Sequence, residues 1–280
     1  MTSLAELAQR HARLQQVSGI MTAMKSLSLV ETRKLARFID HQRRMRANIE
    51  AAAADFLQFH RATVPTDGAE DAAILVLIGS ERGFCGNFNE RIVQALARLA
   101  PEHGAAPMLV VGRRLGARLG AHAQLRARID GATVVEEVPQ VLRRLVDAVH
   151  ELRLHSGLGR TALRCLAHDA GGEPVLAQLL PLPGPQGPRR HADPPQLQLS
   201  PAAFYGELIG EFLLAALYGQ LYDSLAAENH QRLAHMENAL ERLDQTLARL
   251  RLRRNALRQE RVVEEIEVML ANAMAFDRPA

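Results

Sequence analysis

The sequence contains no tryptophan, and aromatic residues make up only 4% of its 280 positions. Surfaces that bind single-stranded nucleic acid stack the bases on aromatic side chains, so this scarcity argues against such a function. Only two cysteines are present, Cys85 and Cys165, far apart in the chain. This excludes a disulfide framework and a CxxC metal pair, and we expect a cytoplasmic protein.

Long hydrophobic runs are also missing. The longest, Ala72 to Ile78, falls far short of the roughly 20 residues that a membrane-spanning helix needs. The N-terminal segment is amphipathic and has no apolar region of the kind found in signal peptides. We therefore expect no transmembrane segment and no export. A hydrophobic content of 48% over 280 residues is typical of a helix-rich protein with one or two domains.

Lysine is nearly absent, since Lys25 and Lys34 are the only two lysines among 34 basic residues. The arginines gather in two segments near the ends of the chain, although the net charge is only +3. Such runs are usually a solvated helix face, and the alternatives are an acidic protein partner or nucleic acid. Because no aromatic residues alternate with the arginines, the acidic protein partner is the better functional interpretation.

Two segments with a seven-residue apolar repeat occupy the ends of the chain, from Leu4 to Phe59 and from about Ala202 to Ala275. Such a repeat is typical of a coiled coil. As helices these segments would be roughly 80 and 110 Å long, against about 30 Å for a small domain. We expect them to pack antiparallel as one intramolecular coiled coil. The apolar columns of the first are Leu7, Leu14, Met21, Leu35, Ile49 and Phe56, and Val17, Met24, Phe38, Met45, Ala52 and Phe59; those of the second are Leu208, Ala215, Tyr222, Asn229, Met236, Leu243, Leu250 and Leu257, and Phe212, Gly219, Ala226, Leu233, Leu240 and Leu247.

The apolar stripe of the second segment slips past Leu257. A slip of this kind changes the supercoil locally or marks where the helix loses its partner and continues alone. Polar residues within the seam reduce stability but fix the register of the two helices. The residues of the displaced stripe are Val262, Ile266, Met269, Ala273 and Phe276, and the polar seam residues are Ser28, Glu31, Gln42, Asn229, Arg254 and Arg261.

Between these segments the sequence alternates strand and helix patterns, as in a mostly parallel sheet. The apolar run from Ala73 to Ile78 is typical of a strand buried on both faces. We therefore predict an α/β fold with long helices, in which the antiparallel coiled coil is joined by a central Rossmann-like α/β domain. The other predicted strands are 108–111, 133–137, 160–167 and 174–180, and the predicted helices of this region are 89–100, 113–119 and 138–154.

Proline and glycine indicate the domain boundaries. A breaker-rich turn from Val64 to Gly68 ends the first helix, and a proline-rich stretch from Pro181 to Pro195 behaves as an extended linker. Ser200 is a suitable N-cap with Pro201 at the first helical position. The predicted division is an N-terminal coiled-coil helix 1–62, an α/β domain 70–182, a linker 183–199 and a C-terminal coiled-coil helix 200–280.

No catalytic, cofactor or metal site is evident in the sequence. The loop from Gly79 to Asn89 lacks both the G-x-G-x-x-G pattern and the terminal Lys-Ser/Thr of phosphate-binding loops. Cys85 has no histidine and acid in a recognised arrangement, which favours a buried structural thiol. His150 and His155 are five residues apart, so they do not share a helix face as zinc ligands would. We expect no catalytic site of its own.

Three blocks of sequence together resemble the gamma subunit of the F-type ATP synthase. Ile20 to Leu27 (IMTAMKSL) is similar to that family's I-T-x-A-M-K-x-V block, and Ser80 to Asn89 (SERGFCGNFN) to its S-D-R-G-L-C-G-x-x-N block. Near the end, Ala227 to Asn229 and Asn255 to Gln259 resemble its A-S-E-N and N-x-x-R-Q blocks. The order of the blocks and the elements that carry them also agree, and the resemblance covers nearly the whole chain.

The resemblance implies a non-catalytic central-stalk rotor, which couples rotation driven by proton or sodium flow to ATP synthesis or hydrolysis in a catalytic hexamer. The implied partners are the alpha and beta subunits of that hexamer, an epsilon-type stalk subunit and the membrane c-ring, on the cytoplasmic side of the cell membrane. Met24 and Lys25 would lie near the acidic lever of a catalytic subunit, and Arg258 with Gln259 match a pair that hydrogen-bonds one of its loops. The structural residues of the middle block are Arg82, Gly83, Cys85, Gly86 and Asn89.

Several positions depart from the family's pattern. Glu81 stands in place of aspartate, Phe84 in place of leucine, and Val262-Val263 in place of an Ile-Thr pair, so one hydroxyl contact is missing. These departures indicate a divergent member and leave open an alternative F-type complex that pumps sodium or works mainly in hydrolysis. The competing hypothesis is a basic coiled-coil scaffold or nucleic-acid-binding protein with an accessory α/β domain, which would bind DNA or RNA in a salt-sensitive manner.

Overall fold

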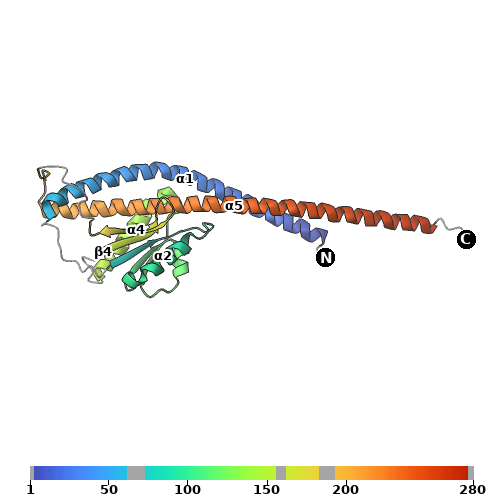
Figure 1. Ribbon diagram of the computed structural model, residues 1–280, viewed down its shortest axis with the longest axis horizontal. Coiled ribbons are helices and arrows are strands. Elements are labelled where there is room, and N and C mark those ends of the chain that lie inside the picture. The colour runs from blue at the N-terminus through green and yellow to red at the C-terminus, as the bar shows by residue number, and fades with distance from the viewer. Residues whose placement is uncertain (1–2, 62–72, 156–161, 183–192, 277–280) are drawn as a thin grey trace. The chain divides into compact units, whose positions relative to one another are not determined.

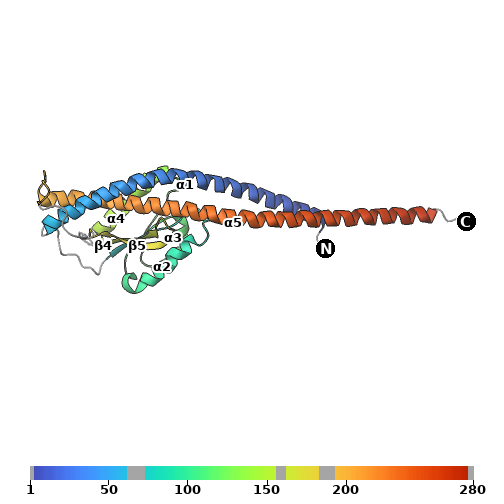
Figure 2. The same ribbon diagram turned by 45° about the horizontal axis from the view of Figure 1, so that its top comes forward.

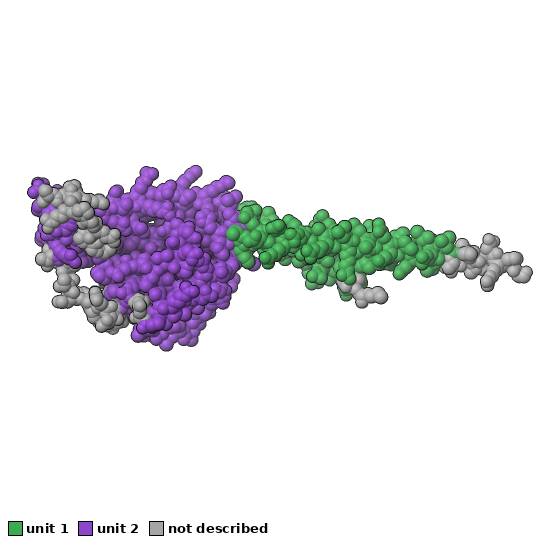
Figure 3. Space-filling view, in the orientation of Figure 1, with its two compact units in different colours: residues 1–27, 234–280 green, residues 28–233 purple. Residues whose placement is uncertain are grey.

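The computed structural model describes residues 3–61, 73–155, 162–182 and 193–276. They form two compact units, residues 1–27 with 234–280 (unit 1) and residues 28–233 (unit 2), and both long helices contribute to each unit (Figure 3). In chain order the elements are α1 (Leu4–His60), β1 (Ala73–Ile78), α2 (Phe88–His103), β2 (Met108–Val111), α3 (Arg113–Leu119), β3 (Leu125–Ile129), the short 3-10 helix η2 (Val135–Glu137), α4 (Val138–His155), β4 (Ala162–His168), β5 (Pro174–Leu180) and α5 (Pro201–Phe276).

A five-stranded sheet lies at the centre of unit 2, with the strand order β3-β2-β1-β4-β5. The first four strands are parallel, and β5 pairs antiparallel with β4. All six residues of β1 are buried, as the continuous apolar run predicts for a central strand. This order, which reverses direction at β1, is that of the Rossmann fold. The predicted α/β class and the mostly parallel sheet are confirmed.

Alternate side chains of β1 enter two different cores. Ile74, Val76 and Ile78 join the larger core, which is completed by α4 and by the parts of α1 and α5 that belong to unit 2. Leu75 and Leu77 join a smaller core with α2 and α3. Because side chains alternate across a strand, the sheet is covered on one face by α2 and α3 and on the other by α4 and the two long helices.

Within each unit α1 and α5 lie side by side and antiparallel (Figures 1 and 2). In unit 1 the Nζ of Lys25 is 2.9 Å from Oε1 of Glu237, and Arg251 Nε donates to Nε2 of His11 at 3.2 Å. In unit 2 Phe38 stacks on Tyr222 with ring centroids 6.0 Å apart, and Phe56 packs on Phe204 at 5.0 Å. Over these pairs a higher residue number in α1 goes with a lower one in α5, as expected for two antiparallel helices. The predicted antiparallel coiled coil is therefore confirmed.

One of the two predicted seam columns in α1 was only partly correct, since Met24, Met45 and Phe59 are half-buried but its other three residues are exposed. Val17 and Phe38 are 44% and 45% exposed and Ala52 is exposed, whereas Ile39 and Ala53, one position further on, are buried. A seven-residue repeat allows the second seam residue to follow the first by three or by four positions. The prediction followed the larger apolar residues at a spacing of three, whereas the buried Ile39 and Ala53 follow Leu35 and Ile49 by four positions.

The seam of α5 agrees with the sequence, since every residue of both predicted columns is buried or half-buried. From Arg258 to Leu270, in contrast, every side chain is exposed. The slip of the apolar stripe past Leu257 therefore marks the point where α5 continues without a partner.

The predicted strand at 133–137 was also wrong. Both the backbone nitrogen and Oγ1 of Thr133 donate to Oε2 of Glu137, at 2.7 and 2.9 Å, which favours a tight turn into η2 and then α4. The strand that was missed is β3. It lies at the edge of the sheet and alternates exposed arginines with apolar residues, so its hydrophobic signal is weak.

Some predictions concern residues outside the described part of the chain. These are the turn at 64–68, the start of the strand predicted at 160–167, and residues 183–192 of the proline-rich linker. The predicted cap of the last helix is present, because Ala203 N donates to Ser200 Oγ at 3.4 Å and Phe204 N to Ser200 O at 2.9 Å.

Helix α5 contains an apolar stretch of 18 residues, of which 28% is buried. By length and composition alone it could cross a membrane, which was not expected from the sequence. However, Leu208, Phe212 and Leu217 of this helix belong to the larger core of unit 2. A helix buried in a protein core can be equally long and apolar, and we interpret the apolar part of α5 as such a core helix.

Candidate interaction sites on the paired helices and the loop after β1

The loop from Gly79 to Asn89, which connects β1 to α2, is held by its own buried polar groups. Asn89 Oδ1 accepts a hydrogen bond from Ser80 N at 2.9 Å, and Asn89 Nδ2 donates to Ser80 Oγ at 2.7 Å. The thiol of Cys85 donates to the same hydroxyl at 3.3 Å. Burial raises the pKa of this thiol, so it stays protonated at neutral pH. Asn89 and Cys85 are therefore bound within the loop through the hydroxyl of Ser80.

The far side of the same loop is exposed and adopts a left-handed backbone. Gly86 has φ 59° and Phe84 has φ 64°. A positive φ suits glycine but is unfavourable for a large side chain. The Phe84 ring is 56% exposed, and Arg82 is exposed beside it. The loop therefore exposes an aromatic and a basic side chain to solvent, while buried hydrogen bonds hold its backbone in place.

Glu81 anchors this loop to two neighbouring segments. Its side chain is buried, and its Oε2 accepts hydrogen bonds from Arg113 N at 2.9 Å and Gly131 N at 2.8 Å. Its Oε1 lies 3.3 Å from Nε of Arg113, at the start of α3. The glutamate at this position thus acts as a structural acceptor for three donors.

A buried ion pair on α5 holds the other side of the loop. Glu228 and Arg232 are each 4% exposed and form an ion pair one helical turn apart. Arg232 Nε donates to Gly83 O at 3.2 Å, and the Glu228 carboxylate accepts from the backbone nitrogens of Glu81 and Arg82, each at 3.4 Å. Burial raises the pKa of Glu228, and the charge of Arg232 opposes that shift. Sequence reasoning missed Arg232, although its spacing from Glu228 is that of a helical ion pair.

The residues predicted to contact partners all lie in unit 1 but do not form one site. Met24 is half-buried, and Lys25 pairs with Glu237 while keeping 38% of its side-chain surface exposed. Arg258 and Gln259 are exposed on α5, about 30 Å along the helix from Glu237. An exposed ion pair contributes little free energy, so Lys25 can exchange Glu237 for another carboxylate.

The unpaired part of α5 carries an exposed apolar surface. Large contiguous apolar surfaces on a soluble protein usually mark interaction sites. The exposed fractions here range from 47% to 65%. The residues are Val262, Val263, Ile266, Val268, Met269 and Leu270.

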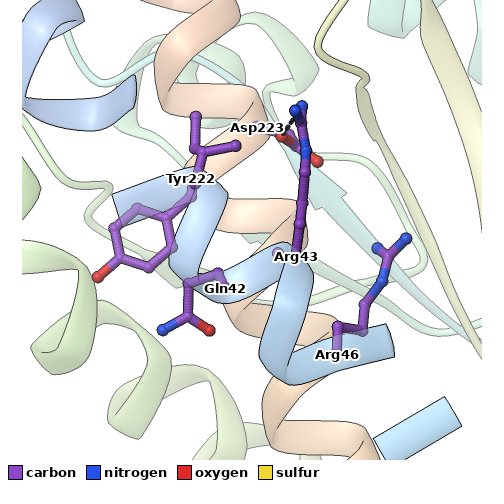
Figure 4. A pocket seen from close by; sticks show the side chains of 7 residues that line it. Gln42, Arg43, Arg46, Tyr222 and Asp223 are labelled. Carbon is purple, nitrogen blue, oxygen red and sulfur yellow. Dashed lines mark ion pairs between the residues drawn. The ribbon is translucent and has the colours of Figure 1, made fainter. Parts of the chain in front are cut away.

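A small pocket lies between α1 and α5 in unit 2 (Figure 4). The space in which a water molecule could be centred is about 10 Å³, which is room for one water at most. Nη2 of Arg43 lies 3.5 Å from Oδ1 of Asp223 at its wall. In the part of the chain that the structure describes, no group of three or more metal-ligating side chains is present. The pocket is lined by Ile39, Gln42, Arg43, Arg46, Gly219, Tyr222 and Asp223.

The family model and the relatives described below each match nearly the full length of this chain. A family model described as ATP synthase matches residues 3–276. The ATP synthase gamma chain of Paraburkholderia xenovorans (strain LB400) is 24% identical over 298 residues, which is 97% of this chain and all of that relative. The gamma chain of Anaeromyxobacter sp. (strain Fw109-5) is 26% identical over 301 residues, covering 99% of this chain and 100% of the relative.

Two solved assemblies contain chains of the same fold. The rotor of the Euglena gracilis mitochondrial ATP synthase matches with a TM-score of 0.62 and 14% identity, covering 92% of this chain and 98% of that one. The central stalk and c-ring structure of the Tetrahymena thermophila mitochondrial ATP synthase matches with a TM-score of 0.55 and 20% identity, covering 79% and 99%.

Proposed function

This chain belongs to the ATP synthase gamma family, and from that premise we propose that it is the central-stalk rotor of an F-type complex. The observation that carries the proposal is the family match over residues 3–276, which includes both long helices and the sheet. Identities of 22–26% to the curated gamma chains support a divergent member. The matches give no support to the alternative of a nucleic-acid-binding protein or scaffold.

The proposed partners are the alpha and beta subunits of the catalytic hexamer, an epsilon-type stalk subunit and the membrane c-ring. The chain itself acts without a catalytic site and works on the cytoplasmic side of the membrane as part of the complex. The exposed apolar end of α5 supports this role, because an isolated soluble helix gains nothing from such a surface.

The rotor acts by presenting a different face to each catalytic subunit as it turns. Arg258 and Gln259 are free to hydrogen-bond a catalytic subunit, since both are exposed beyond the paired part of α5. Lys25 offers a weaker, exchangeable contact, because its ion pair with Glu237 is exposed to solvent. Exposed polar contacts can be remade at each step while still selecting the correct partner. The nucleotide state of each catalytic site is thereby coupled to the rotor angle.

The first test of this proposal is assembly. A tagged full-length chain, expressed with the other subunits of the complex, is expected to co-purify with the catalytic hexamer. If the chain is recovered without the hexamer, the proposal is wrong.

The second test concerns the contact residues. Arg258→Ala with Gln259→Ala should lower ATP-driven ion pumping by the reconstituted complex, by roughly tenfold if hydrogen bonds to a charged group are lost. Both side chains are exposed, so the circular dichroism of the isolated chain should not change. Arg253→Ala, also exposed on α5, is the matched control and should pump normally. Unchanged pumping in the double variant would rule out these contacts while leaving the assembly result to stand.

A further inference from the structure

Two buried glutamates, one on each long helix, attach the helix pair to the α/β part of unit 2. They are Glu31 on α1 and Glu228 on α5, with exposed fractions of 9% and 4%. Glu31 accepts a hydrogen bond from one backbone nitrogen of the α/β part and Glu228 from two, and each glutamate lies beside a basic residue of its own helix. We refer to Glu31, Lys34, Glu228 and Arg232 together as the collar.

On α5 the attachment is to the loop after β1. The Glu228 carboxylate accepts from Glu81 N and Arg82 N, both at 3.4 Å. Arg232 donates to Gly83 O at 3.2 Å and is paired with Glu228. One turn of α5 thus hydrogen-bonds both to backbone N–H groups and to a backbone carbonyl of the loop.

On α1 the attachment is to the start of η2. Oε2 of Glu31 accepts from Val135 N at 3.3 Å. The Lys34 ammonium lies 3.1 Å from Oε1 of Glu31 and 3.1 Å from Oε1 of Glu136. The arrangement resembles that on α5, but Glu31 accepts from a single backbone amide and Lys34 keeps 44% of its side-chain surface exposed.

The two attachments lie at the same level of the coiled coil. Phe38 of α1 stacks on Tyr222 of α5. Two helical turns from this pair, toward the N-terminus of α1 and the C-terminus of α5, lie Glu31 and Asn229. Asn229 is between Glu228 and Arg232 and accepts from Arg232 Nη1 at 3.0 Å. Both helices are therefore attached to the α/β part near the end of unit 2.

We propose that the collar fixes the rotational angle of the helix pair against the α/β part of unit 2. A single attachment would act as a pivot, but two attachments on different helices at one level resist both sliding and rotation. Apolar packing alone is non-directional, whereas a carboxylate that accepts two amides defines an angle. If the chain is the rotor proposed above, torque passes between the α/β part and the shaft at this level.

The cost of the Glu228–Arg232 pair, the half of the collar in which both side chains are buried, supports a positioning role. Burying an ion pair is often no better for stability than apolar side chains of similar volume, and the best-attested use of such pairs is to specify geometry. Replacing all four residues with methionine should therefore leave the fold intact while removing the directional contacts. The four-methionine variant therefore distinguishes a collar that sets an angle from a collar that only stabilises the fold.

The test measures the angle directly in the full-length chain. Spin labels are placed at Gln94→Cys on α2 and His230→Cys on α5, both exposed and both in unit 2, while the native Cys85 and Cys165 are buried. The distance distribution between the labels is compared for the wild-type collar and for Glu31→Met, Lys34→Met, Glu228→Met and Arg232→Met combined. We expect a broader distribution, and amide exchange at Glu81, Arg82 and Val135 that is faster by about tenfold or more.

The matched control is the Arg91→Met and Glu173→Met variant, which removes an ion pair inside the α/β part. It should keep the narrow distribution. If the four-residue variant does not fold, the Glu31/Lys34 and Glu228/Arg232 pairs are replaced separately, and each must broaden the distribution more than the control does. Equal widths in the collar and control variants would overturn the proposal.

A last measurement separates the collar from the proposed function. In the reconstituted complex, the four-residue variant should pump fewer ions for each ATP hydrolysed. A broadened distribution with unchanged pumping would overturn the passage of torque through the collar. Failure of the chain to assemble with the hexamer would overturn the proposed function and leave the spectroscopic result valid.

Discussion

Acidification should destabilise unit 2 through one histidine, His168 at the end of β4. Its side chain is 1% exposed and stacks on Phe88 with ring centroids 3.8 Å apart, and neither ring nitrogen has a hydrogen-bond partner among the residues that the structure describes. Burial, and then the charge of Arg91, lowers the pKa of His168 from 6.5 to about 4, although Glu173 and Asp169 act in the opposite direction. The folded protein therefore keeps this ring neutral at pH values where the unfolded chain protonates it.

The size of the effect follows from the two pKa values. A shift of one unit corresponds to about 1.4 kcal/mol, so the difference between 6.5 and about 4 amounts to roughly 3 kcal/mol. Because the folded pKa lies below the unfolded one, this stability is present above about pH 6.5 and is lost as the pH falls toward about 4. His168→Phe should remove this dependence, since phenylalanine can keep the stack on Phe88 without a titrating group.

Urea unfolding at about pH 7.5 and about pH 4.5 measures this effect. The near-ultraviolet circular dichroism of Tyr205, Tyr218 and Tyr222 reports on unit 2, because all three tyrosines lie in its part of α5. Between these pH values the free energy of unfolding of the wild type should fall by about 2.5 kcal/mol more than that of His168→Phe. His230→Phe, at an exposed position of α5, should behave as the wild type. If the wild type and His168→Phe lose the same stability on acidification, the reasoning is refuted.

Two further predictions concern the loop after β1. Gly79→Ala should destabilise unit 2 by about 1–3 kcal/mol, because the added Cβ would lie 2.5 Å from Cβ of Leu115. Gly206→Ala in α5 should stabilise by up to about 1 kcal/mol, because its Cβ meets nothing within 4 Å. The two variants should shift the thermal unfolding temperature in opposite directions, and shifts of the same sign would contradict the prediction. Asn89→Ala should cost about 1–3 kcal/mol by leaving the buried donor and acceptor of the loop unpaired. Asn87→Ala, at an exposed position, should lower the free energy of unfolding by less than about 0.5 kcal/mol. If urea unfolding shows the same loss for both variants, the role of Asn89 is contradicted.

Strong local patterns were enough to predict most of the fold. The bounds of β1, β2, α3 and β5 agree with the sequence because apolar runs and glycines delimit them sharply. The edge strand β3 was missed, since its burial alternates and two of its five residues are arginines. One seam column of α1 was only partly correct, because periodicity alone does not say which of two neighbouring columns faces the partner helix.

Sequence alone indicates a residue of the candidate sites best where its partners are close in the chain. Cys85 and Asn89 were named from the family resemblance, and both bond to Ser80, five and nine positions away. Glu31 and Glu228 instead accept from backbone nitrogens 104 and about 147 residues away, which only the packing of the long helices against the sheet brings close. The sequence gives no sign of such distant partners.

The most direct test of the rotor assignment is single-molecule rotation. The catalytic hexamer with this chain is fixed to a surface, and a bead is attached through Gln94→Cys, which is exposed on α2. Addition of ATP should drive the bead in continuous rotation in one direction. A chain that binds the hexamer and leaves the bead stationary while ATP is hydrolysed would contradict the assignment.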